Sequence, residues 1–81
     1  MRILLSRRAA RDLDDLLPRL QSTVRKQLEL LAANIRHPSL QSKKCDETND
    51  IWQGRVNRSY RFYFQIAGDD YVILRIIPHP K

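Results

Sequence analysis

Residues 51–79 read IWQGRVNRSYRFYFQIAGDDYVILRIIPH, and three strand-like runs in this stretch decide the fold. At a spacing of two residues, one side of the runs is mainly aromatic and aliphatic. We expect this side to consist of Trp52, Gly54, Val56, Tyr60, Phe62, Phe64, Ile66, Val72, Leu74 and Ile76. We expect the opposite side to consist of Gln53, Arg55, Asn57, Arg61, Tyr63, Gln65, Tyr71, Ile73, Arg75, Ile77 and His79. The stretch therefore predicts a sheet with one sealed apolar face and one open face that carries arginines.

Short polar segments separate the three runs. Residues 57–59 and residues 68–70 are each short enough to connect neighbouring antiparallel strands as a hairpin. The C-terminal half is therefore predicted to be a three-stranded antiparallel meander.

The N-terminal half reads as one short strand followed by two helices. Residues 3–5 are aliphatic, and Ser6 is a typical helix N-cap because its hydroxyl can accept a free backbone amide. Pro18 cannot continue the first helix without a kink, so we expect it to begin the second. Asn34 and the pair His37-Pro38 are expected to end the second helix.

The two helices carry apolar stripes that need a surface to cover, and the apolar face of the sheet supplies it. Residues 39–50 are polar and basic, which predicts a loop with room for a short strand at its start. We therefore expect a two-layer α+β fold, with an N-terminal short strand and an antiparallel helix hairpin packed on a sheet that contains the meander. Residues 1–81 are expected to form a single domain, because 81 residues support one core but not two.

Composition narrows the classes of partner. The formal net charge is +6, which favours an anionic partner, although a solvated basic surface is an equally simple explanation. The single cysteine, Cys45, cannot form an internal disulfide, and no segment reads as a signal peptide or a membrane span. We therefore expect a cytoplasmic protein without a membrane partner.

Three arginines on the open face suggest a phosphate site. Arg55, Arg61 and Arg75 are expected to lie within reach of one another, since neighbouring strands are about 5 Å apart. Like charges at that distance repel, and a phosphate between the guanidinium groups would relieve the repulsion. The alternatives are that a carboxylate from residues 46–50 pairs with them, or that they spread into solvent.

Other polar residues in this region have both a functional and an ordinary interpretation. Tyr63 can stack on a nucleotide base or pack at the edge of the sheet. His79 can transfer protons beside a bound phosphate or be a surface histidine near the chain end. Lys43 and Lys44 can contact a phosphate or remain solvated. The sequence has no Cys/His metal spacing and no glycine-rich phosphate loop, so we expect no cofactor and metal-free chemistry in any reaction.

These features together resemble the RelE/ParE superfamily of bacterial toxins of type II toxin-antitoxin systems. The resemblance covers most of the chain, including the helix hairpin with Asp12-x-x-Asp15-Leu16-Leu17-Pro18. It is strongest in residues 52–64, WQGRVNRSYRFYF, and in residues 69–79, DDYVILRIIPH.

The resemblance implies a ribosome-dependent, metal-free endoribonuclease that cleaves mRNA and so inhibits translation. In that chemistry the ribose 2′-hydroxyl attacks the adjacent phosphorus. The resemblance implies a role for individual residues. Lys43 or Lys44 would match the basic position of the loop, and Arg61 would match the arginine that stabilises the phosphate. Arg75 or His79 would match the acid near the chain end. The expected residues for binding RNA and phosphate are Gln53, Arg55, Arg58 and Tyr63. The implied partners are a cognate antitoxin, the ribosome and mRNA, with the toxin alone monomeric.

Two other functions remain open. ParE-like chains share the hairpin, and the resemblance equally allows an inhibitor that binds DNA gyrase without cutting nucleic acid. A catalytically inactive relative that only binds RNA or an antitoxin is the third possibility. It is motivated by the end of the sequence at Lys81, where many active relatives continue with an aromatic residue, and by Ile77-Pro78 in place of a glycine-containing turn.

Overall fold

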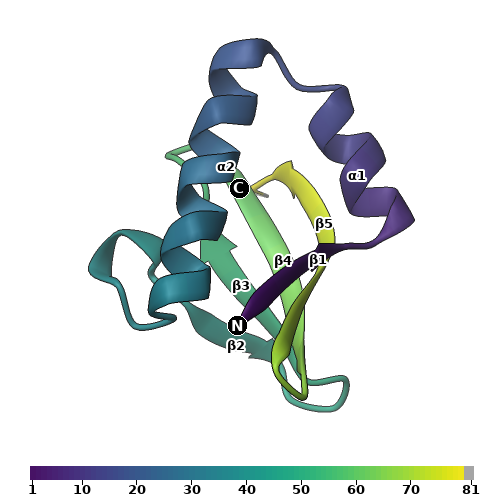
Figure 1. Ribbon diagram of the computed structural model, residues 1–81, viewed down its shortest axis with the longest axis vertical. Coiled ribbons are helices and arrows are strands. Elements are labelled where there is room, and N and C mark those ends of the chain that lie inside the picture. The colour runs from purple at the N-terminus through teal and green to yellow at the C-terminus, as the bar shows by residue number, and fades with distance from the viewer. Residues whose placement is uncertain (80–81) are drawn as a thin grey trace.

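The computed structural model of the protein describes residues 1–79. The elements follow one another as β1 (Arg2–Leu5), α1 (Arg7–Asp14), α2 (Pro18–Ala33), the 3-10 helix η1 (Pro38–Leu40), β2 (Lys43–Asp46), β3 (Ile51–Arg55), β4 (Tyr60–Ala67) and β5 (Asp70–Pro78). The strands form one sheet in the order β1-β5-β4-β3-β2, in which only β1 and β5 are parallel. Both helices lie on one side of this sheet (Figure 1). The predicted two-layer α+β fold is therefore confirmed.

The helix boundaries follow the local signals in the sequence. The Ser6 hydroxyl accepts the amide of Ala9 and also donates to the carbonyl of Leu74, so the cap of α1 is tied to β5. Pro18 occupies the start of α2, and Asn34 is its C-cap. The predicted starts of both helices and the predicted end of the second are thus confirmed.

The core lies between the helices and the sheet. Its largest fully buried side chains are Phe62, Phe64, Leu31, Leu40, Ile73 and Val24. Phe64 packs against Phe62 and Tyr71 with ring centroids 5.6 Å apart in each case. None of the helices within residues 1–79 has the length and apolar character needed to cross a lipid bilayer.

One part of the predicted sheet pattern is wrong. Tyr71 and Ile73 are buried in the core, where Val72 and Leu74 were expected. The cause is a β-bulge: Tyr63 pairs with Arg75 but Phe64 pairs with Ile73, so Leu74 is the extra residue. The bulge reverses the alternation once, and the residues after it, from Arg75 to Ile77, return to the expected sides.

The polar segment 39–50 is also more regular than expected. After η1, residues 43–46 form β2, an edge strand paired with β3, so Lys43 and Lys44 lie on a strand and not in a loop. The side chain of Asp46 accepts hydrogen bonds from the amide and side chain of Asn49, which closes the turn before β3.

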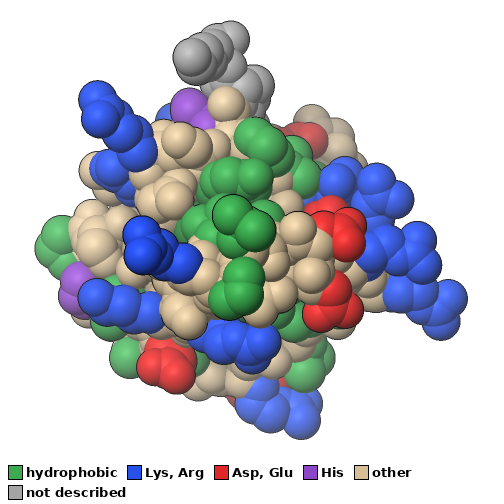
Figure 2. Space-filling view, turned by 90° about the horizontal axis from the view of Figure 1, so that it is seen from above, with side chains coloured by type: hydrophobic (Ala, Val, Ile, Leu, Met, Phe, Trp, Pro, Cys, Tyr) green, Lys and Arg blue, Asp and Glu red, His purple; other side chains and the backbone are tan. Residues whose placement is uncertain are grey.

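At the opposite end of the molecule, Leu17 in the α1–α2 connection is 77% exposed. Figure 2, which views the molecule from above, shows hydrophobic side chains in a central strip with lysines and arginines on both sides.

Candidate anion-binding face

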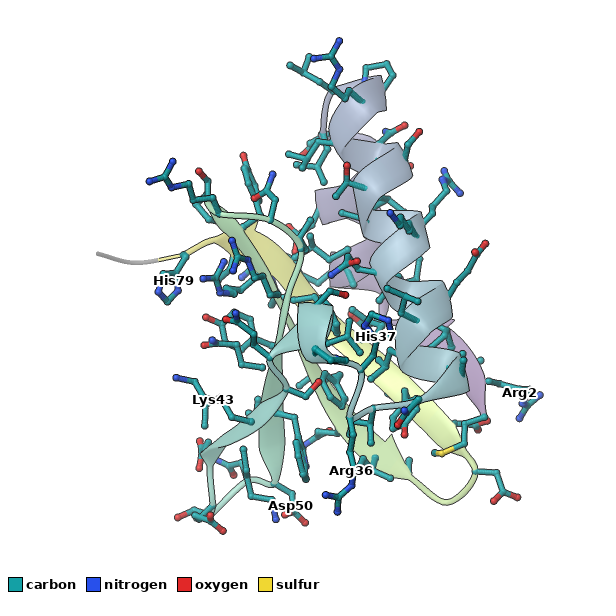
Figure 3. The ribbon with its side chains drawn as sticks, turned by 90° about the vertical axis from the view of Figure 1, so that its left-hand side faces the viewer. Arg2, Arg36, His37, Lys43, Asp50 and His79 are labelled. Carbon is teal, nitrogen blue, oxygen red and sulfur yellow. The ribbon has the colours of Figure 1, made fainter. Side chains whose placement is uncertain are left out.

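We use the term outer face for the side of the sheet that is turned away from the helices. Strand register defines two rows of residues on it. The first row runs across four strands as Lys43, Gln53, Tyr63 and Arg75, and the second runs across three as Arg55, Arg61 and Ile77. Figure 3 shows the side chains of Lys43 and His79 projecting on the side away from the helices. The outer face thus collects most of the predicted site residues.

Arg55 and Arg61 lie directly opposite each other on β3 and β4. Such a pair has Cβ atoms only about 5 Å apart, and like charges in that position destabilise a sheet. Within residues 1–79, neither guanidinium forms an ion pair with a carboxylate. Arg55 and Arg61 are thus neighbours in strand register, and the expected alternative of neutralisation by the carboxylates of residues 46–50 does not apply to them.

The β3–β4 turn holds Arg61 in place. One guanidinium nitrogen of Arg61 donates to the carbonyls of Asn57, at 2.6 Å, and Tyr60, at 2.9 Å. The side chain of Asn57 accepts the amides of Ser59 and Tyr60, which fixes the turn and leaves Arg58 exposed within it. Because these bonds occupy one nitrogen, the rest of the guanidinium group keeps donors available for an anion.

Arg75 does not join the other two arginines. Its Nε lies 2.8 Å from a carboxylate oxygen of Asp12 on α1, and the same oxygen accepts the amide of Ile76. Burial alone would raise the pKa of Asp12, but the hydrogen bonds from Arg75 and Ile76 outweigh burial and hold that pKa below its ordinary value of 3.8. The expected convergence of three arginines is thus wrong for Arg75, which is neutralised by an internal carboxylate and joins α1 to β5.

The two adjacent lysines also separate. Lys44 pairs with Asp50 at 2.8 Å and lies 5.5 Å from the ring centroid of Trp52. The hydrogen bond to Asp50 raises the pKa of Lys44 above its ordinary value. Lys43 pairs in register with Gln53 and forms no ion pair with another described residue. Of the two lysines, Lys43 is the one on the outer face.

His79 continues the β4–β5 pairing beyond the end of the strand. Its amide donates to the carbonyl of Ser59 at 2.7 Å, and its side chain is exposed. It comes two residues after Ile77, which is opposite Arg61. His79 and Arg61 therefore lie near each other on the outer face.

Tyr63 lies in the middle of the first row, between Gln53 and Arg75, and is half-buried. The ring is thus bordered by polar side chains and remains partly accessible to a planar ligand. Its position agrees with the predicted placement on the arginine-bearing side.

Sequence reasoning missed Asp12 as the partner of Arg75. The two residues are 63 positions apart, and no local pattern connects them. In the sequence, Asp12 reads as an exposed charge of the first helix, four residues after Arg8, and nothing there indicates a partner on the last strand.

The sequence model of the ParE toxin of type II toxin-antitoxin system parDE matches residues 3–80. No curated protein matches the chain in sequence. The fold is similar to that of the YoeB/ParE toxin from Agrobacterium tumefaciens, with a TM-score of 0.82, 10% identity, and coverage of 99% of this chain and 100% of that chain. It is also similar to the YoeB dimer from Staphylococcus aureus, with a TM-score of 0.81, 14% identity, and coverage of 99% and 98%.

A third similar structure is the toxin-antitoxin complex RelBE2 from Mycobacterium tuberculosis, with a TM-score of 0.79, 23% identity and coverage of 96% of each chain. At identities of 10–23%, the similarity to these solved structures shows the fold alone. The family is shown by the ParE sequence model, which matches residues 3–80. The chain is a toxin of a type II toxin-antitoxin system and belongs to the ParE toxin family within the RelE/ParE superfamily.

Proposed function

We propose that this toxin is a ribosome-dependent endoribonuclease that binds mRNA on its outer face, cleaves it without a metal and so inhibits translation. The observation that carries the proposal is the direct opposition of Arg55 and Arg61 on neighbouring strands with no carboxylate between them. Like charges directly opposite each other destabilise a sheet, and a phosphodiester would offset this repulsion because it offers the paired oxygens that guanidinium groups prefer.

The positions of the residues assign them different tasks. Arg61 is fixed by the turn carbonyls and stabilises the extra charge on the phosphate during attack, while Arg55 holds the phosphate from the next strand. The 2′-hydroxyl gives its proton to water as its oxygen bonds to phosphorus, and the bond between phosphorus and the 5′-oxygen breaks. His79, diagonal to Arg61, donates its own proton to the leaving 5′-oxygen. Tyr63 and Gln53 lie in the adjacent row, where a base can stack and accept a hydrogen bond.

Lys43 is too distant to act on the same phosphate as His79. It lies on β2, three strands from β5, and strands are about 5 Å apart, so the two are separated by roughly 14 Å across the sheet alone. Lys43 is therefore assigned to a flanking phosphate. Arg58, exposed in the β3–β4 turn, is assigned to the backbone on the other side.

The proposal also includes a cognate antitoxin that holds the toxin inactive. Support comes from similar folds that occur in toxin-antitoxin complexes, among them RelBE2 from Mycobacterium tuberculosis and the YoeB-YefM complex from Staphylococcus aureus. The toxin acts in the cytoplasm, where ribosomes and messages are found.

A second function, inhibition of DNA gyrase, is favoured by the match to the ParE family model. Two assays on the purified toxin separate the functions. Added to translating ribosomes, a ribonuclease produces new 5′ ends within the message and leaves gyrase supercoiling unchanged. An intact message together with loss of supercoiling would establish the gyrase function instead. An effect in neither assay would indicate a relative that only binds RNA or the antitoxin.

A further inference from the structure

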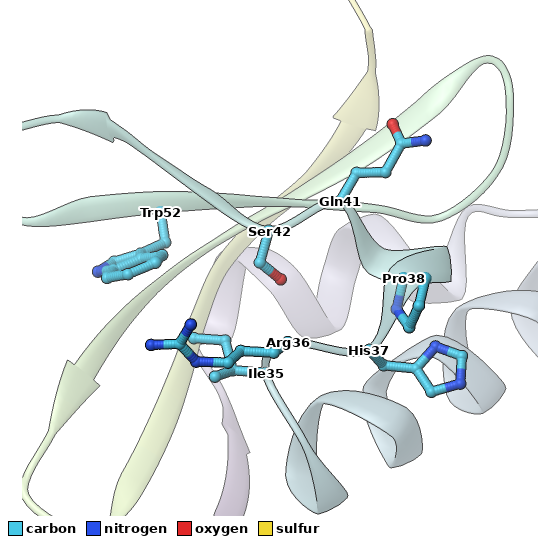
Figure 4. Close-up of a pocket in the computed structure, with 7 residues that line it drawn as sticks. All are labelled: Ile35, Arg36, His37, Pro38, Gln41, Ser42 and Trp52. Atoms are coloured by element: carbon cyan, nitrogen blue, oxygen red, sulfur yellow. The ribbon is translucent and has the colours of Figure 1, made fainter.

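A second concave site lies on the helix side of the sheet, apart from the outer face. It is a pocket of about 420 Å³ between residues 35–38, which follow α2, and residues 41–42, which precede β2, with Trp52 of β3 on its wall. Its wall includes Ile35, Arg36, Pro38, Ser42 and Trp52 (Figure 4). This volume lies within the range of pockets that bind small molecules or inserted side chains.

Three different chemical groups converge in this pocket. Figure 4 shows the guanidinium group of Arg36, the hydroxyl of Ser42 and the indole of Trp52 around the same space, while the ring of His37 points away. The hydroxyl oxygen of Ser42 is buried and, within residues 1–79, has no hydrogen-bond partner. Because this oxygen has almost no accessible surface, a ligand in the open space of the pocket contacts Arg36 and Trp52 and not this hydroxyl.

The pocket wall is built by hydrogen bonds of its own. The side chain of Asn34 accepts the amide of Arg36, and the Nδ1 atom of His37 accepts the amide of Ser39. Gln41 adopts a left-handed backbone conformation with a φ of 47°, which directs the chain from η1 to Ser42. The shape of the pocket is therefore fixed before any ligand arrives.

The charge and polarity of the wall specify the ligand. The lining residues include an arginine and no carboxylate, and Lys44 lies next to the indole of Trp52. Arg36 forms no ion pair with another described residue. Ile35, Pro38 and the indole supply apolar surface beside these donors. We propose that this pocket binds a carboxylate carried on an apolar group, with Arg36 donating to the carboxylate and Trp52 covering the apolar part.

Trp52 is the only tryptophan of the chain, so its fluorescence reports directly on the pocket. The purified toxin is titrated with 3-phenylpropionate and, separately, with its neutral isostere 3-phenylpropanamide. We expect the carboxylate to change the fluorescence with a Kd on the order of 1 mM, the range for a ligand of this size. The amide should bind at least about 10-fold more weakly, because it lacks the charge-assisted hydrogen bond. Equal binding of both compounds, or of neither, would overturn the proposal.

Substitutions then test the donors. Arg36→Gln should weaken phenylpropionate about 10-fold, whereas Arg25→Gln, an exposed arginine in the middle of α2, should leave the affinity unchanged. Ser42→Ala should raise the thermal unfolding midpoint and leave the affinity for phenylpropionate unchanged, since it removes a buried hydroxyl that has no partner and that the ligand cannot reach. Unchanged phenylpropionate affinity in Arg36→Gln, or an equal loss in Arg36→Gln and Arg25→Gln, would contradict the assignment.

The carboxylate can belong to a partner polypeptide or to a free metabolite, and a further arm distinguishes these sources. The antitoxin encoded beside the toxin gene is titrated against the wild type, Arg36→Gln and Arg25→Gln. A loss of antitoxin affinity confined to Arg36→Gln, with competition by phenylpropionate, identifies an antitoxin side chain as the ligand. Unchanged antitoxin affinity of Arg36→Gln, together with its weaker binding of phenylpropionate, identifies a free metabolite as the source of the carboxylate.

Discussion

At the scale of single residues, Gly54 on β3 leaves room on the helix side of the sheet for the ring of Phe62 on β4. Gly54 is opposite Phe62, and a Cβ atom at position 54 would collide with the Phe62 ring. The Phe62 ring is fully buried, so it cannot move aside without disturbing the core.

Gly54→Ala is therefore expected to destabilise the protein by about 1–3 kcal/mol, the usual cost of overpacking. The measurement is urea unfolding followed by circular dichroism. Gln53→Ala, at the next position of the same strand but on the outer face, is the control and should change stability far less. Equal stability of Gly54→Ala and wild type would show that the ring can be displaced at little cost.

At the scale of elements, the Asp12–Arg75 pair joins α1 to β5 beyond the end of β1. Asp12 also accepts the amide of Ile76, a residue of β5 that β1 does not pair with. The Asp12 side chain is only 14% exposed, so its loss leaves Arg75 and a backbone amide without their partner. The pair thus completes the edge of the sheet that a longer first strand would otherwise cover.

Asp12→Asn should lower the free energy of unfolding at neutral pH by about 1–3 kcal/mol. Because the folded protein lowers the pKa of Asp12 below 3.8, the stabilisation is present above that value and is lost as the pH falls through the lower, folded-state pKa. The difference between Asp12→Asn and wild type should therefore shrink in acid. Urea unfolding at a series of pH values measures it, with Asp14→Asn at the exposed end of α1 as the control. A difference that stays constant down to the lowest pH would contradict this role.

Local signals were sufficient to predict most elements but not the phase of the last strand. Ser6 and Pro18 each act on backbone within one turn, so their effects can be read from the sequence. The run from Tyr71 to Ile77 is almost entirely apolar, so a period of two fits either phase and cannot locate the bulge at Leu74. Contacts between distant residues, such as Asp12 with Arg75 and Lys44 with Asp50, depended on the folded structure. Because these contacts pair Arg75 and Lys44 with carboxylates, they leave Lys43, Arg55 and Arg61 among the predicted site cations that can bind an anion.

At the scale of the whole molecule, the net charge of +6 is not concentrated in one place. Arg2, Lys44 and Arg75 are held by carboxylates of the chain itself. Lys43, Arg55 and Arg61 form no ion pair with a described residue, and all three lie on the outer face. Arginines of α1, among them Arg7 and Arg8, also form no ion pair with a described residue, so charge alone does not select the outer face, and its distinguishing feature is the opposed pair Arg55 and Arg61.

Binding of single-stranded RNA is expected to weaken with salt. Three phosphate contacts release counterions and give a slope of log affinity against log salt near −2, from about −0.7 per contact. Lys43→Gln should reduce the magnitude of this slope by about 0.7, because Lys43 alone is assigned to its flanking phosphate, while Arg25→Gln should leave the slope unchanged. Fluorescence anisotropy over a series of salt concentrations provides the values. Equal slopes for wild type and both variants would place the RNA elsewhere on the molecule.

The central claim is that Arg55 and Arg61 together hold the phosphate that is cleaved. Its most direct test is the rate of message cleavage on translating ribosomes, measured by mapping 5′ ends, for wild type, Arg55→Gln, Arg61→Lys and Arg25→Gln. We predict a loss of roughly 10²- to 10³-fold for the two outer-face variants and wild-type cleavage for Arg25→Gln. Arg55→Gln is the decisive variant because the Arg55 side chain has no ion pair within residues 1–79, so its replacement leaves the fold intact. Cleavage at the wild-type rate by folded Arg55→Gln and Arg61→Lys would contradict the claim.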